Sequence, residues 1–340
     1  MFGFQKGHLV NWDVQRKVWD WTFGRDCLNV SFDETHLVLT EPYLDFSSVQ
    51  ETLDEIFFED FEFGGLFRIN PATLSVFQYA ARNPSSRCCL VVDSGHSFTH
   101  VIPYFKGQPI KEAMVRIDVG GKALTNHMKE IISYRQLHVL DETYVINQCK
   151  ELACFVSQDF MADMKRAKLK RSCNEIVRDY VLPDFVNVHR GVLREPGGGK
   201  PLAAATETEQ VIRLGNERFT VPEILFHPSD IGLNQMGISE ALLHVTNECP
   251  SVLQPHLLSN ILLTGGSCRF SGFNSRVLSD VRALTNASVD VNVTISESPE
   301  CYAWEGGRLL TTSPYFDDMV VTRKEYLEHG HRICQQRFVI

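Results

Sequence analysis

The sequence predicts an α/β protein, and two runs of apolar residues carry most of that prediction. Cys88–Val92 and Ile261–Thr264 lack the polar alternation of a half-exposed strand. Strands of this kind are buried on both faces, as in sheets covered by helices. Segments with helical periodicity and helix-capping residues surround them, and no repeat of fixed period occurs. At 340 residues the chain has room for one large or two medium domains.

The first elements are predicted from capping residues and periodicity. Asn11 precedes apolar residues spaced three and four apart, which predicts a helix over 13–23. The run 36–40 is typical of a strand. Ser48, followed three residues later by Glu51, predicts a capping box at the start of the next helix.

The following segment is predicted to continue with a helix and a pair of strands. Asn70 is followed by a proline, and this pair predicts a helix over 71–82. Residues 97–104 and 112–118 are predicted to pair as strands through a turn at 106–109.

The centre of the chain is predicted to be mainly helical. A helix is predicted from about Lys122, and the helical pattern extends over 130–180. Within it, Lys165–Arg171 is the densest basic cluster of the chain. A solvated helix face is favoured for this cluster over a nuclear-import or nucleic-acid patch. Residues 194–209 are rich in Gly, Ala and Thr, which predicts a flexible surface loop.

Composition excludes several classes of protein. Apolar residues make up 44% and charged residues 22%, which argues against wholesale disorder and fibrous repeats. The formal net charge of −9 argues against a chain that coats nucleic acid by bulk charge. No apolar run approaches the ~20 residues of a membrane-spanning helix, and the first residues do not resemble a signal peptide. Ten cysteines without a Cys-x-x-Cys pair indicate reduced thiols in an intracellular protein.

Glycines at the ends of the two apolar strands are compatible with a nucleotide site. Asp93-Ser94-Gly95 ends the first strand, where backbone N–H groups can approach a phosphate and an aspartate can hold Mg²⁺ through water. Gly265-Gly266 ends the second strand and leads toward a helix. Ordinary turns are the alternative for both segments, and a structural role is the default for His100. The sequence contains no P-loop, His-Glu-x-x-His or Gly-x-Ser-x-Gly motif.

Taken in order, the segments of the chain resemble the actin family. Six segments spread over nearly the whole chain match the landmarks of the family, namely VNWDVQRKVWDWTF (10–23), DSGHSFTHVIPYFKG (93–107), IDVGGKALT (117–125), IRLGNERFTVPEILFHPS (212–229), LLTGGSCRFSGF (262–273) and YAWEGG (302–307). Within the family, three further segments are similar to the nuclear class called actin-related protein six, namely 130–151, 155–160 and 317–326.

The resemblance implies a bilobed, ribonuclease H-like α/β fold with ATP between the lobes. It implies three parts, which are the large subdomain of the first lobe (1–84 and 303–340), the large subdomain of the second lobe (85–119 and 240–302) and its small subdomain (120–239, with a loop at 194–210).

The resemblance also assigns residues to the nucleotide. Asp93, Ser94 and Gly95 match the second phosphate loop, and Asp93 is the carboxylate on the Mg²⁺ side, acting through water. Gln78 falls where the family positions the attacking water, and His100 falls where the family assists it. The other implied contacts to ATP or ADP are Gly121, Lys150, Glu151, Gly265, Gly266 and Phe270.

Departures from the family pattern weaken the implied chemistry. The chain begins where the family is already past its first strands, so we expect the first phosphate loop and the following small subdomain to be missing and the first lobe to be incomplete. His96 and Ser97 replace a common aspartate and glycine, and Cys301 replaces a frequent base-contacting lysine. We therefore expect no catalytic activity beyond a vestigial ATPase, with ATP and Mg²⁺ bound weakly or not at all.

Three classes of function remain after this comparison with the family pattern. The resemblance favours a non-catalytic docking scaffold in a nuclear chromatin-remodelling complex that exchanges a variant histone. Its implied partners are a remodelling ATPase motor subunit and a zinc-bearing subunit, with indirect contact to variant histone or nucleosome and no membrane or sequence-specific nucleic-acid binding. The nucleus is the expected compartment, with the cytoplasm second. The alternatives are an ATP-binding and ATP-hydrolysing actin-like enzyme and, ranked last, a filament or filament-binding protein of the cytoskeleton.

Overall fold

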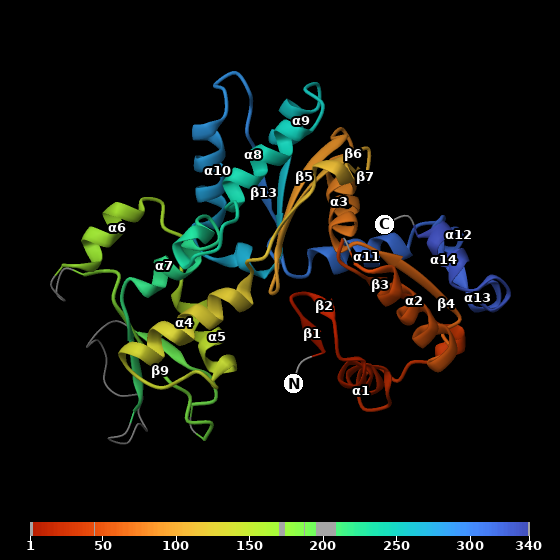
Figure 1. Cartoon of the computed structure of the whole chain (residues 1–340), viewed down its shortest axis with the longest axis horizontal. Helices are drawn as coiled ribbons and strands as arrows, with labels where there is room; N and C mark the ends of the chain where they lie inside the picture. The colour runs from red at the N-terminus through yellow and green to blue at the C-terminus, as the bar shows by residue number, and fades with distance from the viewer. Residues whose placement is uncertain (1–2, 44, 170–173, 187, 195–208, 339–340) are drawn as a thin grey trace. The chain divides into compact units, whose positions relative to one another are not determined.

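The computed structural model describes residues 3–43, 45–169, 174–186, 188–194 and 209–338 (Figure 1). The chain divides into two compact units. Unit 1 comprises Met1–Arg87, Tyr104–Pro109 and Glu300–Ile340, and unit 2 comprises Cys88–Pro103 and Ile110–Pro299. The three-part division expected from the family resemblance stays a prediction.

Unit 1 begins with a short hairpin, β1 (Phe4–Gln5) and β2 (His8–Leu9), followed by α1 (Trp12–Phe23). The predicted helix is confirmed, and so is its cap, because the Asn11 side chain accepts a hydrogen bond from the Val14 N–H at 3.1 Å.

A three-stranded sheet forms the middle of unit 1. β3 (His36–Thr40) is the predicted strand, and it runs parallel to β4 (Gly65–Ile69), which pairs antiparallel with β14 (Val321–Thr322). A 3₁₀ turn, η1 (Phe32–Glu34), precedes β3.

The capping box predicted at Ser48 and Glu51 is wrong. α2 (Ser47–Glu55) starts two residues earlier, with Phe46 in place of Ser48 at the N-cap position, and has no side-chain cap. Ser48 is already inside the helix, where its carbonyl accepts a hydrogen bond from the Thr52 hydroxyl at 2.9 Å. The helix then continues as a π-helical turn, η2 (Ile56–Asp60), whose first three residues are buried in a phenylalanine-rich core.

The remaining helices of unit 1 complete this core. α3 (Pro71–Arg82) matches its predicted bounds, and Asn70 caps it by accepting from the Ala72 N–H at 2.8 Å. α11 (Tyr302–Thr311) packs closely on α3, since a Cβ at Gly306 would collide with the Leu74 carbonyl. Three short helices close the unit, namely α12 (Phe316–Met319), α13 (Arg323–His329) and α14 (His331–Arg337).

The main sheet of unit 2 confirms the two buried strands. β12 (Ile261–Thr264) lies between β13 (Val293–Ile295) and β5 (Cys88–Ser94), and all three run parallel. β6 (Thr99–Phe105) follows β5 in the sheet and pairs antiparallel with β8 (Val115–Ile117), as predicted. The intervening turn is longer than predicted, because it contains β7 (Gln108–Pro109) and a 3₁₀ turn, η3 (Lys111–Ala113).

Some helices of unit 2 pack on this sheet, and others lie beside a smaller sheet that is separate from it (Figure 1). The helices are α4 (Gly121–Arg135), α5 (Thr143–Ala153), α6 (Phe160–Ala167), α7 (Glu217–Glu223), α8 (Ile238–Glu248), α9 (Gln254–Leu258) and α10 (Phe273–Leu284), with 3₁₀ turns η5 (Pro228–Ile231) and η6 (Gly266–Arg269). The smaller sheet has the order β10 (Val192–Arg194), β9 (Arg178–Val181), β11 (Val211–Leu214).

The helical prediction for 130–180 is therefore wrong at its end. β9 pairs antiparallel with both β10 and β11, partners that periodicity within the segment does not reveal. Asn174 favours a turn before β9, because its side-chain oxygen accepts hydrogen bonds from the Ile176 and Val177 N–H groups.

Two predictions fall partly outside the described residues. Most of the predicted loop at 194–209 lies there, as do Lys170 and Arg171 of the basic cluster. No helix in the part of the chain that the structure describes is long and apolar enough to cross a membrane.

Candidate functional site at the ends of β5 and β12

The two glycine-bearing strand ends lie side by side in unit 2. β5 and β12 are parallel neighbours in which Asp93 is the partner of Thr264. Gly265 has φ +90°, and a Cβ there would collide with the Ser94 carbonyl and lie 3.0 Å from Asp93 Oδ1. The Ser267 hydroxyl donates to the Gly95 carbonyl at 3.3 Å. The segments 93–95 and 265–267 therefore form one tightly packed corner.

A third glycine segment packs against the same corner. The Gly121 N–H donates to the Gly95 carbonyl at 3.0 Å, and the Lys122 N–H donates to the His96 carbonyl at 2.8 Å. A Cβ at Gly120 would lie 2.7–2.8 Å from backbone atoms of the 95–98 turn. Glycine is required here because the start of α4 and this turn approach each other too closely for a side chain.

Lys150 fixes the start of α4 to the end of α5. It is 4% exposed, and its Nζ donates to the Gly121 carbonyl at 3.0 Å, to Thr125 Oγ1 at 2.9 Å and to Asn147 Oδ1 at 2.9 Å. An ammonium group has three N–H donors, so all of them are used within the protein. Burial lowers the pKa of Lys150, and the neighbouring Glu151 carboxylate opposes this change.

Burial shifts the pKa values of two ionisable side chains at the corner. Burial raises the pKa of Asp93 to about 6, while a hydrogen bond from Thr264 opposes the shift. The pKa of His96 is lowered by burial first, and then by the positive charges of Lys150 and Lys122. The corner thus combines a carboxyl group whose charged form is disfavoured by burial with an imidazole that resists protonation.

The remaining implied residues of unit 2 have structural contacts. The Ser94 and Thr99 hydroxyls lie 3.0 Å apart, and Thr99 donates to the Val119 carbonyl at 2.9 Å. His100 is 4% exposed, and its ring centroid lies 4.4 Å from that of Phe98. Phe270 is buried at the end of η6.

Two further residues implied by the resemblance, Glu151 and Gln78, do not belong to the buried corner. Glu151 is exposed and accepts from Asn147 Nδ2 at 2.7 Å. Gln78 belongs to α3 of unit 1, where its amide donates to Glu305 Oε2 at 3.3 Å. The structure thus brings together Asp93, Ser94, Gly95, Gly121, Lys150, Gly265 and Gly266 within unit 2, whereas Gln78 belongs to unit 1.

Comparison with known proteins decides the family. The family model described as Actin matches residues 2–339. The chain belongs to the actin family. This match and the alternation of helices and strands confirm the predicted actin-like α/β fold.

Three relatives place the chain more closely within the actin family. Actin-related protein 6 of Drosophila melanogaster is 44% identical over 99% of this chain and 85% of its own length. Actin-related protein 6 of Arabidopsis thaliana is 40% identical over 98% and 84%. Actin-like protein ARP6 of Cryptococcus neoformans is 37% identical over 98% and 72%. The chain is thus an actin-related protein similar to the class that these names share. The expected absence of a first phosphate loop and small subdomain stays a prediction.

The residues of the corner fit a Mg²⁺-bound nucleotide poorly. Each Lys150 donor and the Gly95 N–H, which donates to the Phe98 carbonyl at 3.0 Å, already serve internal acceptors. A phosphate or ribose would have to replace these internal bonds, so we assign no chemical step to this corner.

Sequence reasoning missed Thr125 and Asn147, which supply two of the three acceptors for Lys150. Each lies one helical turn from its partner, since Thr125 follows Gly121 by four residues and Asn147 precedes Lys150 by three. That spacing was a usable signal, but only the pairing of α4 with α5 brings the two helices together.

We expect Asp93→Asn to stabilise unit 2 at neutral pH. Folding raises the pKa of the Asp93 carboxyl group from 3.8 to about 6. The contribution of this group to the free energy of unfolding therefore falls as the pH rises through that range. The neutral amide removes this penalty, so the variant should gain ~2–3 kcal/mol at about pH 7.5 and little at about pH 4. Urea unfolding in EDTA measures both values. Asp290→Asn, at an exposed position, is the control. Equal stability of Asp93→Asn and wild type at neutral pH would contradict the expectation.

Proposed function

We propose that this chain is a non-catalytic docking subunit of a nuclear chromatin-remodelling complex that exchanges a variant histone into nucleosomes. The observation that carries the proposal is the similarity to proteins named actin-related protein 6 over 98–99% of the chain. The proposed partners are a remodelling ATPase motor subunit and a zinc-bearing subunit, with variant histone contacted indirectly. The proposed compartment is the nucleus.

The arrangement around Lys150 supports the non-catalytic part of the proposal. A nucleotide-hydrolysing site needs charged donors and carboxylates that are free to act on phosphates and metal-bound water. Here the ammonium group of Lys150 is used in holding α4 to α5. The residue after Gly95 is His96, which supplies no carboxylate. The same residues serve a rigid scaffold well, because each bond fixes one element to another.

The test is affinity purification of the endogenous protein from nuclear and cytosolic extracts, with mass spectrometry of stoichiometric partners. The proposal predicts a remodelling ATPase, a zinc-bearing subunit and variant histone in the nuclear fraction. Recovery with cytoskeletal proteins, or recovery alone from both extracts, would contradict it.

A turnover assay tests the alternative, an ATP-hydrolysing actin-like protein of the cytoskeleton. We expect the purified chain to hydrolyse ATP no faster than its Gln78→Ala and His100→Ala variants. Turnover well above both variants would support the alternative.

A further inference from the structure

The surface of α6 departs from an ordinary solvated helix face. At roughly 100° per residue, Met161, Lys165, Lys168 and Leu169 fall within about a third of the helix circumference. The chain continues the turn past the end of α6, because the Lys168 and Leu169 N–H groups donate to the carbonyls of Lys165 and Arg166. Apolar and basic side chains therefore share one face, which we call the α6 face.

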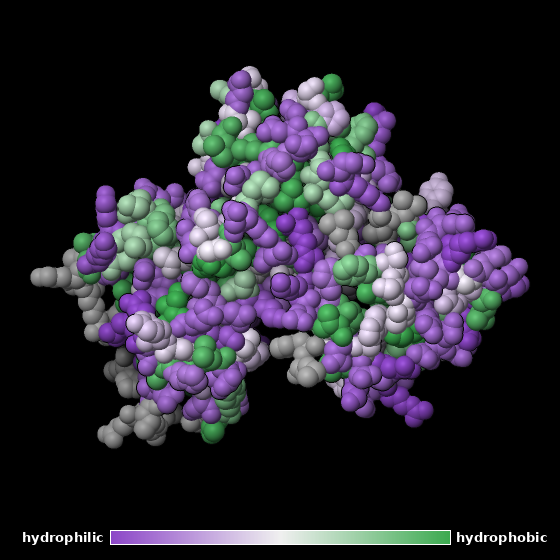
Figure 2. Space-filling model, in the orientation of Figure 1, coloured by the Kyte–Doolittle hydropathy of each residue, from purple (hydrophilic) through white to green (hydrophobic). Residues whose placement is uncertain are grey.

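The α6 face is exposed to solvent. Met161 is 66% exposed and Leu169 is 51% exposed, while both lysines are also exposed. Among the described residues, neither Lys165 nor Lys168 forms an ion pair, whereas Arg166 at the edge of the face pairs with Asp163 at 3.1 Å. Figure 2 shows hydrophobic and hydrophilic residues mixed at this end of unit 2.

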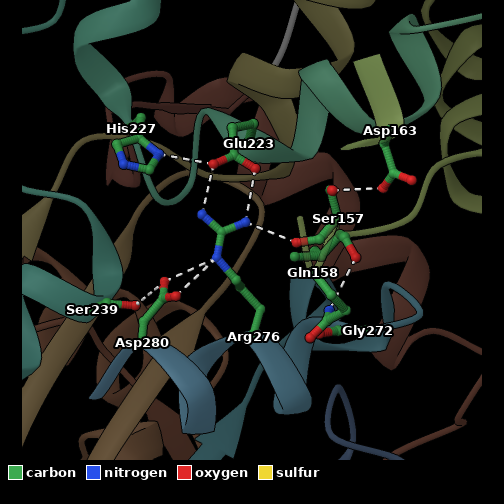
Figure 3. Close-up of polar contacts among 10 residues, drawn as sticks. Ser157, Gln158, Asp163, Glu223, His227, Ser239, Gly272, Arg276 and Asp280 are labelled. Carbon is green, nitrogen blue, oxygen red and sulfur yellow. Dashed lines mark hydrogen bonds and ion pairs between the residues drawn. The ribbon is translucent and has the colours of Figure 1, made fainter. Parts of the chain in front are cut away.

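The opposite side of α6 is held rigidly (Figure 3). Asp163 is buried and accepts a hydrogen bond from the Ser157 hydroxyl at 2.6 Å, and the carbonyl of Ser157 accepts from Arg276 at 2.8 Å. The ring of Phe160 packs edge-on against Phe219 at 5.5 Å. The α6 face is thus presented on a fixed helix, which lowers the entropic cost of binding a partner.

We propose that the α6 face docks an acidic segment of a partner protein, one that carries carboxylates around at least one apolar side chain. The lysines supply charge complementarity, and Met161 and Leu169 supply apolar area that a purely solvated face has no need to expose. Nucleic acid fits less well, because phosphates gain nothing from the apolar residues and the chain as a whole carries a charge of −9.

The test uses the full chain and a fluorescein-labelled peptide of repeated Glu-Leu-Asp-Glu units, with binding followed by fluorescence anisotropy. We expect Lys165→Glu/Lys168→Glu to weaken binding roughly ten- to thirtyfold, because each change removes an attraction and adds a repulsion. Met161→Ser, which leaves the charge unchanged, should weaken it by a smaller factor. Added salt should weaken wild-type binding.

The matched control is Lys17→Glu/Lys324→Glu, which makes the same charge change at exposed lysines of unit 1 and should bind as wild type does. Thermal unfolding of each variant verifies folding. Equal loss in the control, or no binding of the peptide by the wild type, would overturn the proposal. Tighter binding of a labelled DNA duplex, lost in the Lys165→Glu/Lys168→Glu variant, would also overturn it and assign the face to nucleic acid.

Discussion

Arg276→Met should destabilise unit 2 by about 3–5 kcal/mol, because it leaves buried charge without a partner. The Arg276 guanidinium donates to both Glu223 carboxylate oxygens at 2.7 and 3.0 Å and to Asp280 at 3.0 Å (Figure 3). Glu223 is 3% exposed and retains only His227, at 2.8 Å, among the contacts drawn. Burial acts to lower the pKa of Arg276, yet the two carboxylates together raise it, so the guanidinium stays charged.

Urea unfolding followed by circular dichroism measures this loss. Arg190→Met, at an exposed position of unit 2, is the matched control and should change stability by less than ~0.5 kcal/mol. Adding Glu223→Gln to Arg276→Met should recover part of the loss, since the unpaired buried charge is then removed. If the double variant is less stable than Arg276→Met alone, the loss does not arise from that charge.

Arg68→Met should have a comparable effect in unit 1, about 3–5 kcal/mol near neutral pH. Arg68 is 2% exposed and binds two buried carboxylates, with Nη1 at 2.9 and 3.0 Å from Glu41 and Nε at 2.8 Å from Asp54. Burial raises the pKa of both carboxyl groups, and Arg68 is the main group opposing that rise. Its removal should raise both pKa values further.

The loss from Arg68→Met should therefore depend on pH. A carboxyl group with a raised folded-state pKa destabilises the fold above that pKa and ceases to do so when it is protonated. The deficit of the variant should shrink as the pH falls from about 7 to about 5. Urea unfolding across this range tests it, with Arg332→Met at an exposed position of α14 as control. A deficit that does not vary with pH would point to lost packing instead.

Elements with local signals were predictable from the sequence. β3, α3 and β12 match their predicted bounds because each combines a uniform apolar pattern or a side-chain cap with a clear stop. β9 was not predictable in this way, because its strand character depends on two partner strands that come later in the chain. The Ser48 capping box failed because the same residue types also occur inside a first turn.

The candidate site was predictable only in part. Parallel pairing of two apolar strands was enough to bring Asp93 and Gly265 together. By contrast, Lys150 entered through family resemblance, and its internal role depends on acceptors from two helices. The Arg276–Glu223 pair joins residues 53 positions apart on different helices, a distance over which neither periodicity nor capping carries information.

The Lys150 contacts have a consequence for how unit 2 opens. One ammonium group ties the Gly121 carbonyl and the Thr125 hydroxyl in the first turns of α4 to the last turn of α5. Neither helix end can fray without breaking bonds that belong to the other. The two helix ends should therefore unfold locally as one cooperative unit. The 95–98 turn is hydrogen-bonded to the start of α4, so it should open together with them.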